Sequence, residues 1–434
     1  MNRAIVIGGG WAGLSSAVEL QDKGFEVTLL EQSGRLGGRA SSFKDKESGE
    51  ILDNGQHLFM GCYSSTIRFL EKIGSLKDLR FQDKLSVNFV NRKGKIFNLN
   101  CPQIPAPYHL FFGLANLGTL SLVEKFSMLK VYGALKNGAQ NLKTKTVEEW
   151  LIALGQSERA RKYFWDLITI ATLNEQPSIA DAESLRIVLK EAFFSSKEKS
   201  KIALSTVGLS ELCGSSTERY LQDRNSSIRT NVLVSKIEFE GDSVSGVILR
   251  DGTVLKADVY ICAVPFFVLP NLVGEEFERK FFGKLKNLQS SPICSIALWF
   301  DEPVTDLRFA GLLDTQVQWF FNKSKILKSA SKHLSLVISG AHQIITKSDQ
   351  EILKLCMEEL QDCFPKIKGF KLRRALIQRE KNATLSPKIG AQEFRLPQKT
   401  PLKNFFLAGD WTDTGLPATI ESAVLSGVKA VSYL

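Results

Sequence analysis

The sequence predicts an α/β fold in which a domain built on a parallel sheet is interleaved with an α+β domain. Residues 4–7 form a β-branched apolar strand that leads into the pattern Gly8-x-Gly10-x-x-Gly13, and a helix is expected over 12–23. A second strand over 26–30 then ends at Glu31. Strand, glycine turn, helix, strand and acid in this order are the fingerprint of a Rossmann-like domain. With 434 residues, of which 44% are hydrophobic, the chain is long enough for two domains folded together.

The glycine turn predicts a dinucleotide site. Glycines let backbone N–H groups approach a pyrophosphate at a helix N-terminus, where the helix dipole favours negative charge. A carboxylate at the tip of the second strand would accept hydrogen bonds from the adenosine ribose and repel a 2′-phosphate. The residues expected at this end of the cofactor are Gly8, Gly10, Trp11, Ala12, Gly13, Glu31 and Gln32.

A second glycine segment, Arg35-Leu-Gly-Gly-Arg39, follows the acid. It lets the chain pass close to the pyrophosphate and adds guanidinium groups for its oxygens, so Arg35, Gly38 and Arg39 are candidate contacts. This segment resembles the start of the GR2-type FAD-binding fold of the flavin amine oxidase and phytoene desaturase superfamily. The resemblance implies that the dinucleotide is FAD.

The C-terminus resembles the second flavin segment of that superfamily. A buried strand is expected over 405–408, followed by a turn that brings the Asp410 carboxylate to the ribityl chain. Pro417 is expected to start a helix whose N-terminus points at the pyrimidine edge of the flavin. The candidate contacts in this segment are Gly409, Asp410, Pro417, Ala418 and Thr419.

The middle of the chain is expected to alternate between the two domains. The predicted FAD-binding domain comprises residues 1–85, 208–286 and 389–434, and the predicted substrate domain, with a membrane-facing surface, comprises 86–207 and 287–388. In the resembled superfamily the position of Val234 packs on the adenine through its backbone. The principal elements expected here are strands over 232–240, 244–250, 253–256, 259–263, 293–300 and 334–339, and helices over 148–153, 158–171, 208–221 and 349–363.

Two central motifs suggest a narrower resemblance. The run from Asp53 to Tyr63 and the run from Trp165 to Ala182, which includes Thr172-Leu-Asn-Glu-Gln-Pro177, are similar to the squalene-associated FAD enzymes. These are hydroxysqualene dehydroxylases of bacterial squalene and hopanoid synthesis. The resemblance implies reduction of an allylic triterpene alcohol to squalene with loss of water, with the substrate handed over by a hydroxysqualene synthase. It also places Gly55, Gln56 and His57 beside the flavin ring.

Such a reaction needs an acid for the departing hydroxyl and electron-rich surfaces for an allylic cation. His57 is the first candidate for the acid, because an imidazolium can donate a proton near neutral pH, and Glu175 is the second. Trp165 could face the cation. For each residue a structural role is the alternative: flavin or backbone hydrogen bonding for His57, a helix cap or surface acid for Glu175, and core packing for Trp165.

Three other functions stay open at this point. A carotenoid-type desaturase or isomerase would share the fold and cofactor but transfer hydride to oxidised flavin, and the sequence does not assign the direction. An amine oxidase usually has an aromatic cage near the C-terminal flavin motif, where the nearest aromatic residue is Trp411. A non-catalytic lipid carrier, as in the Rab escort and GDP-dissociation proteins, would not need intact glycines, Glu31 and Asp410.

Composition excludes several classes of partner. The seven scattered cysteines form no CxxC pair and indicate reduced thiols in a cytosolic protein, and the four histidines show no metal-ligand spacing. A secretory signal is not expected, because the first strand begins at residue 4. The net charge of +10 is diffuse and comes with no nucleic-acid recognition motif.

A membrane surface is the better match for the charge. Residues 102–123 are apolar but broken by prolines, which excludes a membrane-spanning helix, and residues 124–145 carry five lysines against one acid. We therefore expect peripheral binding to anionic lipid on the inner face of the cytoplasmic membrane, with residues 266–270 as a second docking candidate. The alternative is that these segments are core helices with solvated lysine faces.

Overall fold

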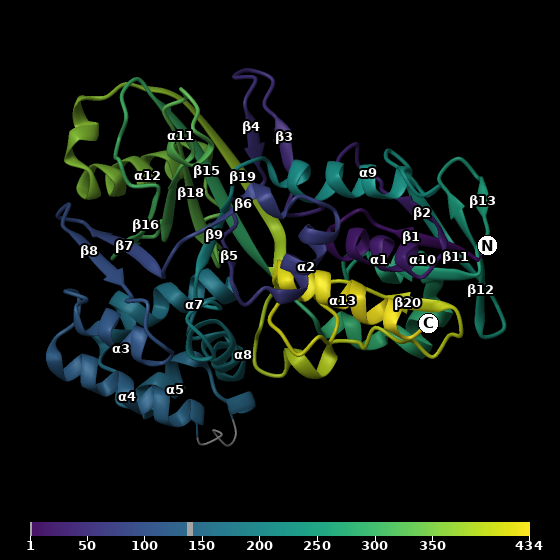
Figure 1. Cartoon of the computed structure of the whole chain (residues 1–434), viewed down its shortest axis with the longest axis horizontal. Helices are drawn as coiled ribbons and strands as arrows, with labels where there is room; N and C mark the ends of the chain where they lie inside the picture. Colours follow the sequence, from purple (N-terminus) through teal and green to yellow (C-terminus); the bar gives the residue numbers. More distant parts are fainter. Residues whose placement is uncertain (1, 137–141) are drawn as a thin grey trace.

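The computed structural model describes residues 2–136 and 142–434. Two regions lie side by side along the long axis of the molecule, and both termini lie in the same one (Figure 1). The first is built on a five-stranded parallel sheet and is called here the parallel-sheet region. The second, called the mixed-sheet region, contains a seven-stranded sheet with helices on both faces.

The parallel sheet has the order β10-β2-β1-β14-β20. Its strands are β1 (Arg3–Ile7), β2 (Glu26–Leu30), β10 (Ser227–Arg229), β14 (Val259–Cys262) and β20 (Phe405–Leu407), all in parallel register. Helix α1 (Trp11–Asp22) joins β1 to β2 and packs against the C-terminal helix α13 (Ile420–Ser432). Gly427 allows this close approach, because a Cβ there would lie 2.1 Å from Ser15 Oγ. The predicted α/β fold with a Rossmann-like domain is confirmed.

Several short elements surround this sheet. An antiparallel sheet of β11 (Val234–Glu240), β12 (Ser243–Leu249) and β13 (Val254–Leu255) lies at the far end, near the chain termini (Figure 1). Helix α10 (Leu269–Phe277) packs against β11, and α9 (Ser216–Gln222) packs against α1. The remaining elements here are β3 (Ser42–Lys44), β4 (Ile51–Asp53), β5 (Phe59–Met60), α2 (Ser64–Lys72) and β6 (Leu79–Phe81).

The seven-stranded sheet has the order β19-β15-β18-β17-β16-β7-β8, and only the β16–β7 pair is parallel. On one face, Ile296 and Leu298 pack against α12 (Asp349–Cys363). On the other face, Trp319 and Val337 pack against the helices of residues 108–188. The strands are β7 (Ser86–Asn91), β8 (Ile96–Asn100), β15 (Ser290–Phe300), β16 (Phe309–Leu313), β17 (Trp319–Asn322), β18 (His333–Ser339) and β19 (Leu372–Leu385).

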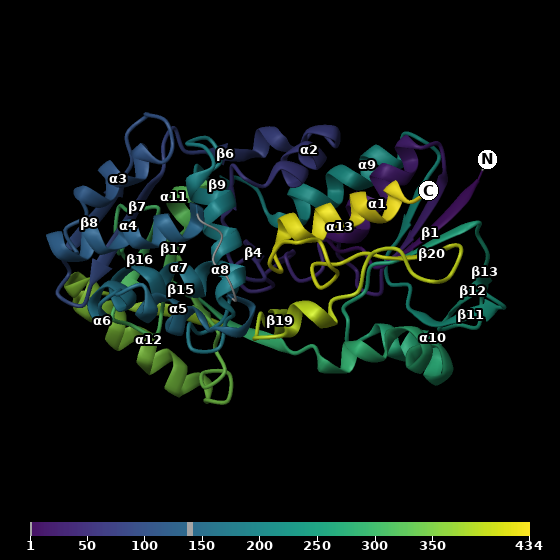
Figure 2. The same cartoon turned by 90° about the horizontal axis from the view of Figure 1, so that it is seen from below.

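The helical layer forms one corner of the mixed-sheet region (Figures 1 and 2). The helix predicted over 158–171 is present and extends to Leu173, with a π-helical turn at residues 161–165 between α6 and α7. Strand β9 (Ile202–Ser205) leaves this layer and pairs with β5 and β6. The predicted boundary at residue 208 would instead assign this strand to the substrate domain. The domain boundaries stay a prediction. The helices are α3 (Tyr108–Ala115), α4 (Leu122–Lys136), α5 (Val147–Ala153), α6 (Glu158–Ala160), α7 (Asp166–Leu173), α8 (Ala182–Val188) and, beside β18, α11 (Lys323–Leu327).

Three further features concern the cysteines, metal ligands and helices of the described residues. The seven cysteines are free thiols, and six of them are buried. Within residues 2–136 and 142–434 there is no group of three histidine, cysteine or carboxylate side chains that could hold a metal ion. In the same part of the chain, no helix has the length and apolar character needed to cross a bilayer.

Candidate active site

The glycine turn after β1 is shaped by two different requirements. Gly8 has φ +105°, and a Cβ on Gly13 would lie 1.9 Å from the Gly8 carbonyl oxygen, so these two glycines permit the turn and the close contact between strand and helix. Gly10 is different: a Cβ there would meet nothing nearer than the Gly38 Cα at 3.9 Å. The space beside Gly10 is therefore free of protein atoms, as a cradle for a pyrophosphate requires.

The N-terminus of α1 is open toward the same space. Gly10 is its N-cap residue, and among the described residues no side chain caps the helix, nor does its first turn contain an acid. Its first backbone N–H groups have no partner within the helix and attract an anion. The residues present therefore fit a dinucleotide pyrophosphate.

Glu31 is buried at the end of β2 and binds the turn itself. One carboxylate oxygen accepts the Gly9 N–H at 2.6 Å, and the other accepts the Ser33 N–H at 2.7 Å. Each oxygen keeps a further lone pair with which the predicted ribose contact could be made. Gln32, next in the chain, is exposed, and Val234 is buried against the sheet that carries β2.

Trp11 corrects one expectation, because its side chain belongs to the core. Its indole N–H donates to the Ala40 carbonyl at 3.1 Å, and its ring lies 5.8 Å from Phe59 and 6.2 Å from Phe69. Only its backbone can face a cofactor. Ala12 is also buried, against α13.

An ion pair joins the two predicted flavin segments. Arg39 Nη2 lies 2.5 Å from Asp410 Oδ1, and Arg39 Nη1 donates to the Ala383 carbonyl of β19 at 2.9 Å. This contact connects residues 371 positions apart and anchors both segments to the mixed-sheet region. Arg35, in contrast, is exposed and lies 5.5 Å from the Phe43 ring.

The C-terminal flavin segment is held by Arg395, a residue that the sequence did not single out. Its buried guanidinium donates to the carbonyl oxygens of Asp410 at 2.8 Å, Thr412 at 2.5 Å and Leu416 at 2.6 Å. The loop that carries the Asp410 carboxylate is thereby fixed. Helix α13 begins at Ile420 with Thr419 as N-cap, so the predicted start at Pro417 is wrong and Pro417 and Ala418 lie in the loop.

The segment after β4 carries a buried polar cluster. Lys323 is only 5% exposed, and its ammonium lies 2.8 Å from Asp53 Oδ2 and 2.8 Å from Gln56 Oε1. Asp53 also accepts hydrogen bonds from Ser42 Oγ and the Leu209 N–H. Lys323 follows β17 and meets the 53–57 segment only in the folded chain, so no local signal could have revealed it.

The surroundings of His57 favour the neutral ring. Its Nδ1 lies 3.0 Å from the Gly55 carbonyl, which can only accept, so Nδ1 carries a hydrogen, and in the neutral ring Nε2 has a lone pair. Burial lowers the pKa of His57 below its ordinary 6.5, and the nearby Lys323 lowers it further, against the opposing effects of the Gly55 carbonyl and Asp53. The predicted role of His57 as a proton-donating imidazolium is therefore not supported.

Glu175 is neither a helix cap nor a surface acid. It is fully buried, and its oxygens accept hydrogen bonds from Ser386 Oγ at 2.6 Å and the Gln176 N–H at 3.1 Å. His342 Nε2 lies 2.9 Å from the same carboxylate. These contacts engage both carboxylate oxygens with protein groups, so the structure gives no support to Glu175 as the proton donor.

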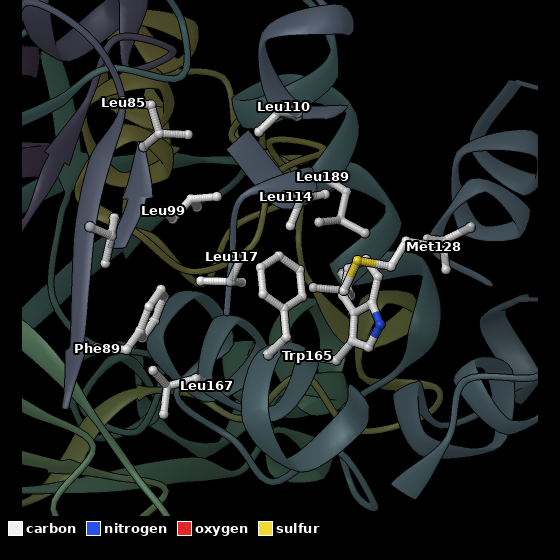
Figure 3. Close-up of a cluster of buried hydrophobic side chains, with 14 of the residues drawn as sticks. Leu85, Phe89, Leu99, Leu110, Leu114, Leu117, Met128, Trp165, Leu167 and Leu189 are labelled. Atoms are coloured by element: carbon white, nitrogen blue, oxygen red, sulfur yellow. The ribbon is translucent and has the colours of Figure 1, made fainter. Parts of the chain in front are cut away.

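Trp165 is a core residue of the helical layer. It is 3% exposed, its indole N–H donates to Gln156 Oε1 at 2.9 Å, and it packs beside Phe164. Figure 3 shows it among apolar side chains that include Met128. The predicted contact with a substrate cation is wrong for this side chain, because core atoms surround it.

A dinucleotide cradle of glycines, together with an ion pair that joins the two predicted flavin segments, is typical of an FAD-dependent oxidoreductase. The chain belongs to the flavin containing amine oxidoreductase family, whose model matches residues 11–434. Members of this family contain flavin, and the predicted FAD is the cofactor of this chain.

Two curated relatives are carotene desaturases. The chain is 27% identical over 443 residues to the 15-cis-phytoene desaturase of an Oncidium hybrid cultivar, a match that covers 98% of this chain and 76% of the relative. It is 26% identical over 482 residues to the zeta-carotene desaturase of Synechocystis sp., covering 100% of this chain and 97% of the relative. Both matches extend over both regions of the fold.

Solved structures show the same architecture. An oxidoreductase from Methanosarcina mazei superposes with a TM-score of 0.77 at 18% identity, covering 99% of this chain and all of that one. Cyclohexylamine oxidase from Brevibacterium oxydans gives a TM-score of 0.73 at 17% identity, covering 100% and 98%. At these identities the likeness concerns the fold.

Proposed function

We propose that the chain is an FAD-dependent desaturase of a long polyprenyl hydrocarbon of the carotene-precursor type. The observation that carries this proposal is the match to phytoene and zeta-carotene desaturases over essentially the whole chain. The proposal replaces reductive dehydroxylation of hydroxysqualene as the leading hypothesis, because the relatives named above are desaturases.

The chemistry of the site supports the same choice. Desaturation breaks two C–H bonds: one hydrogen leaves as a hydride, for which FAD would supply the acceptor, and the other carbon loses a proton as the double bond forms. His57 is suited to receive that proton, because burial lowers its pKa and so favours the neutral ring, in which Nε2 has a lone pair. Dehydroxylation would need a proton donor instead, and neither His57 nor Glu175 is held as one.

The substrate class can be tested by product analysis under anaerobic conditions. Oxidised holoenzyme is mixed with phytoene, zeta-carotene or a polyamine, and reduced holoenzyme is mixed with hydroxysqualene. We expect a product with an additional double bond from one of the two carotenes. Formation of squalene from hydroxysqualene, with both carotenes unchanged, would overturn the proposal.

The base can be tested with His57→Gln, which should retain FAD and slow substrate oxidation by about 10²–10⁴-fold, the usual range for acid–base catalysis. The wild-type rate should fall at acid pH, as protonation blocks Nε2, with a midpoint below 6.5 because the pKa of His57 is lowered. The variant should lack this acid limb. His109→Gln, at a buried histidine of α3 that bonds Ser200, is the matched control and should keep both rate and pH profile. An unchanged acid limb in His57→Gln would exclude His57 as the base.

A further inference from the structure

One face of the α3–α4 hairpin is apolar and open to solvent. Helix α3 contributes Tyr108 and Phe112, and α4 contributes Leu122, Val123, Phe126 and Leu129 at helical spacing. They are six of the fourteen large hydrophobic side chains exposed among the described residues, and Leu122, Val123 and Phe126 are the most exposed of all at 72%, 79% and 70%. We call these six residues the hairpin face.

The hairpin face is not the core side of these helices. Their other side buries Leu110, Leu114, Met128 and Val131 in the large apolar cluster of the mixed-sheet region (Figure 3). A helix that only covers a core carries polar residues toward solvent. Here the solvent side is apolar as well, and an exposed apolar patch on a folded protein marks an interaction surface.

The charge around the hairpin face is positive. Lys130 and Lys136 are exposed on α4, and Lys125 Nζ donates to the Ala115 carbonyl at the end of α3. Between residues 102 and 136 the only acid is Glu124. Its carboxylate is buried and accepts hydrogen bonds from the Ser121 N–H and Ser157 Oγ, both at 2.7 Å. Lys143 and Lys145 are also exposed, and residues 137–141 between them and α4 lie outside the described part of the chain.

We propose that the hairpin face docks on an anionic lipid bilayer. Apolar side chains on a convex helical edge can enter the boundary between head groups and acyl chains, and lysines beside them contact anionic phosphates. Because no described helix can span a bilayer, this contact is peripheral. Charge and apolarity together favour lipid over a protein partner, since the face offers no carboxylate and little hydrogen bonding.

The docking surface is connected to the predicted flavin site by apolar side chains. The cluster beneath the hairpin face includes Leu110 and Met128, extends to Trp319 on the sheet, and is contacted by Leu58, the neighbour of His57. The cluster is close-packed core, so it links the docking surface to the segment of His57 by contact between side chains. The docking proposal does not depend on the proposed function.

The second docking candidate from the sequence, residues 266–270, has one exposed residue, whereas the other four are buried or half-buried. Phe266 is 7% exposed and Leu269 is fully buried, which leaves Phe267 at 40% as the exposed residue with a large apolar side chain. That candidate does not form an apolar patch. Phe267→Ser is therefore a suitable control substitution.

The experiment measures binding of the full-length holoenzyme to vesicles without substrate. The vesicles are phosphatidylcholine alone or phosphatidylcholine mixed with phosphatidylglycerol. We expect binding to the mixed vesicles that weakens as salt rises, because exposed charges are screened within about 10 Å at 0.1 M. Val123→Ser combined with Phe126→Ser should weaken binding by about tenfold or more, since two apolar side chains that would enter the bilayer are removed.

Two controls match these variants. Phe267→Ser should bind as the wild type does. Lys130→Glu with Lys136→Glu should weaken binding to the mixed vesicles. Lys236→Glu with Lys256→Glu changes the total charge equally, in β11 and just after β13 at the opposite end of the molecule, and should have a smaller effect (Figures 1 and 2). Flavin absorbance reports that each variant is folded and loaded.

Unchanged binding of Val123→Ser/Phe126→Ser would overturn the hairpin face as the docking surface. Equal effects of the two lysine pairs would overturn its specific contact with anionic lipid. A protein that binds vesicles through this face but oxidises no polyprenyl substrate would refute the proposed function and leave the docking proposal standing.

Discussion

The nucleotide site of the parallel-sheet region is built from backbone groups, whereas the polar cluster that reaches the mixed-sheet region is built from side chains. The nucleotide cradle is made of backbone: Gly10 leaves space, and the N-terminus of α1 supplies N–H groups. The polar cluster around Lys323 is made of side chains from the 53–57 segment and from α11, and Lys323 lies 270 positions from Asp53 in the sequence. A site made of backbone leaves a glycine spacing in the sequence, and a site made of converging side chains does not.

The largest expected effect separates two glycines of the same motif. Gly13→Val should prevent stable folding, because its Cβ would lie 1.9 Å from the Gly8 carbonyl oxygen. Gly10→Val should fold and lose FAD, because its side chain would fill only the cradle. Thermal unfolding followed by circular dichroism, together with the flavin content, measures the contrast. Full FAD occupancy in Gly10→Val would refute the placement of the pyrophosphate.

In the mixed-sheet region, Trp165→Ala should reduce the free energy of unfolding by about 3–5 kcal/mol, the usual cost of removing a large buried aromatic side chain. FAD occupancy at low temperature should be unchanged, because Trp165 packs in the helical layer. Denaturant titration and the flavin spectrum are the measurements. Trp165→Phe should recover much of the stability. If Trp165→Ala lost substrate oxidation but no stability, Trp165 would be a substrate contact after all.

Arg395→Met should weaken FAD binding by about 3 kcal/mol, or about a hundredfold, because several buried carbonyl groups of the Asp410 loop would lose their donor. Titration of apoprotein with FAD gives the affinity. Arg279→Met, at an arginine whose side chain is 76% exposed, is the control and should bind FAD as the wild type does. Equal affinities for the two variants would show that the loop does not depend on Arg395.

The smallest expected effect concerns Asp166 in α7. Burial raises the pKa of Asp166 to about 6, with Arg161 opposing this shift and Glu148 adding to it. Because the pKa of Asp166 is higher in the folded state than its ordinary value of 3.8, the contribution of this residue to stability is greatest below pH 3.8. That contribution is lost as the pH rises through about 6. Asp166→Asn should remove this decline, on the order of 1 kcal/mol after solvent screening. If the melting temperatures of the wild type and Asp166→Asn changed with pH in parallel, this role of Asp166 would be contradicted.

Much of the parallel-sheet region could be predicted from the sequence. Residues 26–30 form β2 as predicted, and β1 and α1 differ from prediction by one residue at their ends, because turn glycines and apolar periodicity are local signals. The glycine motif predicts a cofactor contact for Trp11 but does not say whether the backbone or the side chain makes it, and the side chain packs in the core.

The catalytic candidates could be predicted less well. His57 was found by its motif, but its protonation depends on the burial and on the Gly55 carbonyl, which only the fold supplies. Glu175 meets Ser386 and His342 from distant segments, and Arg395 reaches the Asp410 loop in the same manner. No spacing in the chain records these contacts.

The most direct test of the proposed function is a single turnover. Oxidised holoenzyme is mixed anaerobically with phytoene or zeta-carotene in vesicles, and the absorbance of oxidised flavin is followed while the product is quantified. The proposal predicts that one of these carotenes bleaches the flavin and yields one new double bond per flavin reduced. Flavin that stays oxidised with both carotenes, while reduced enzyme is reoxidised by hydroxysqualene, would contradict it.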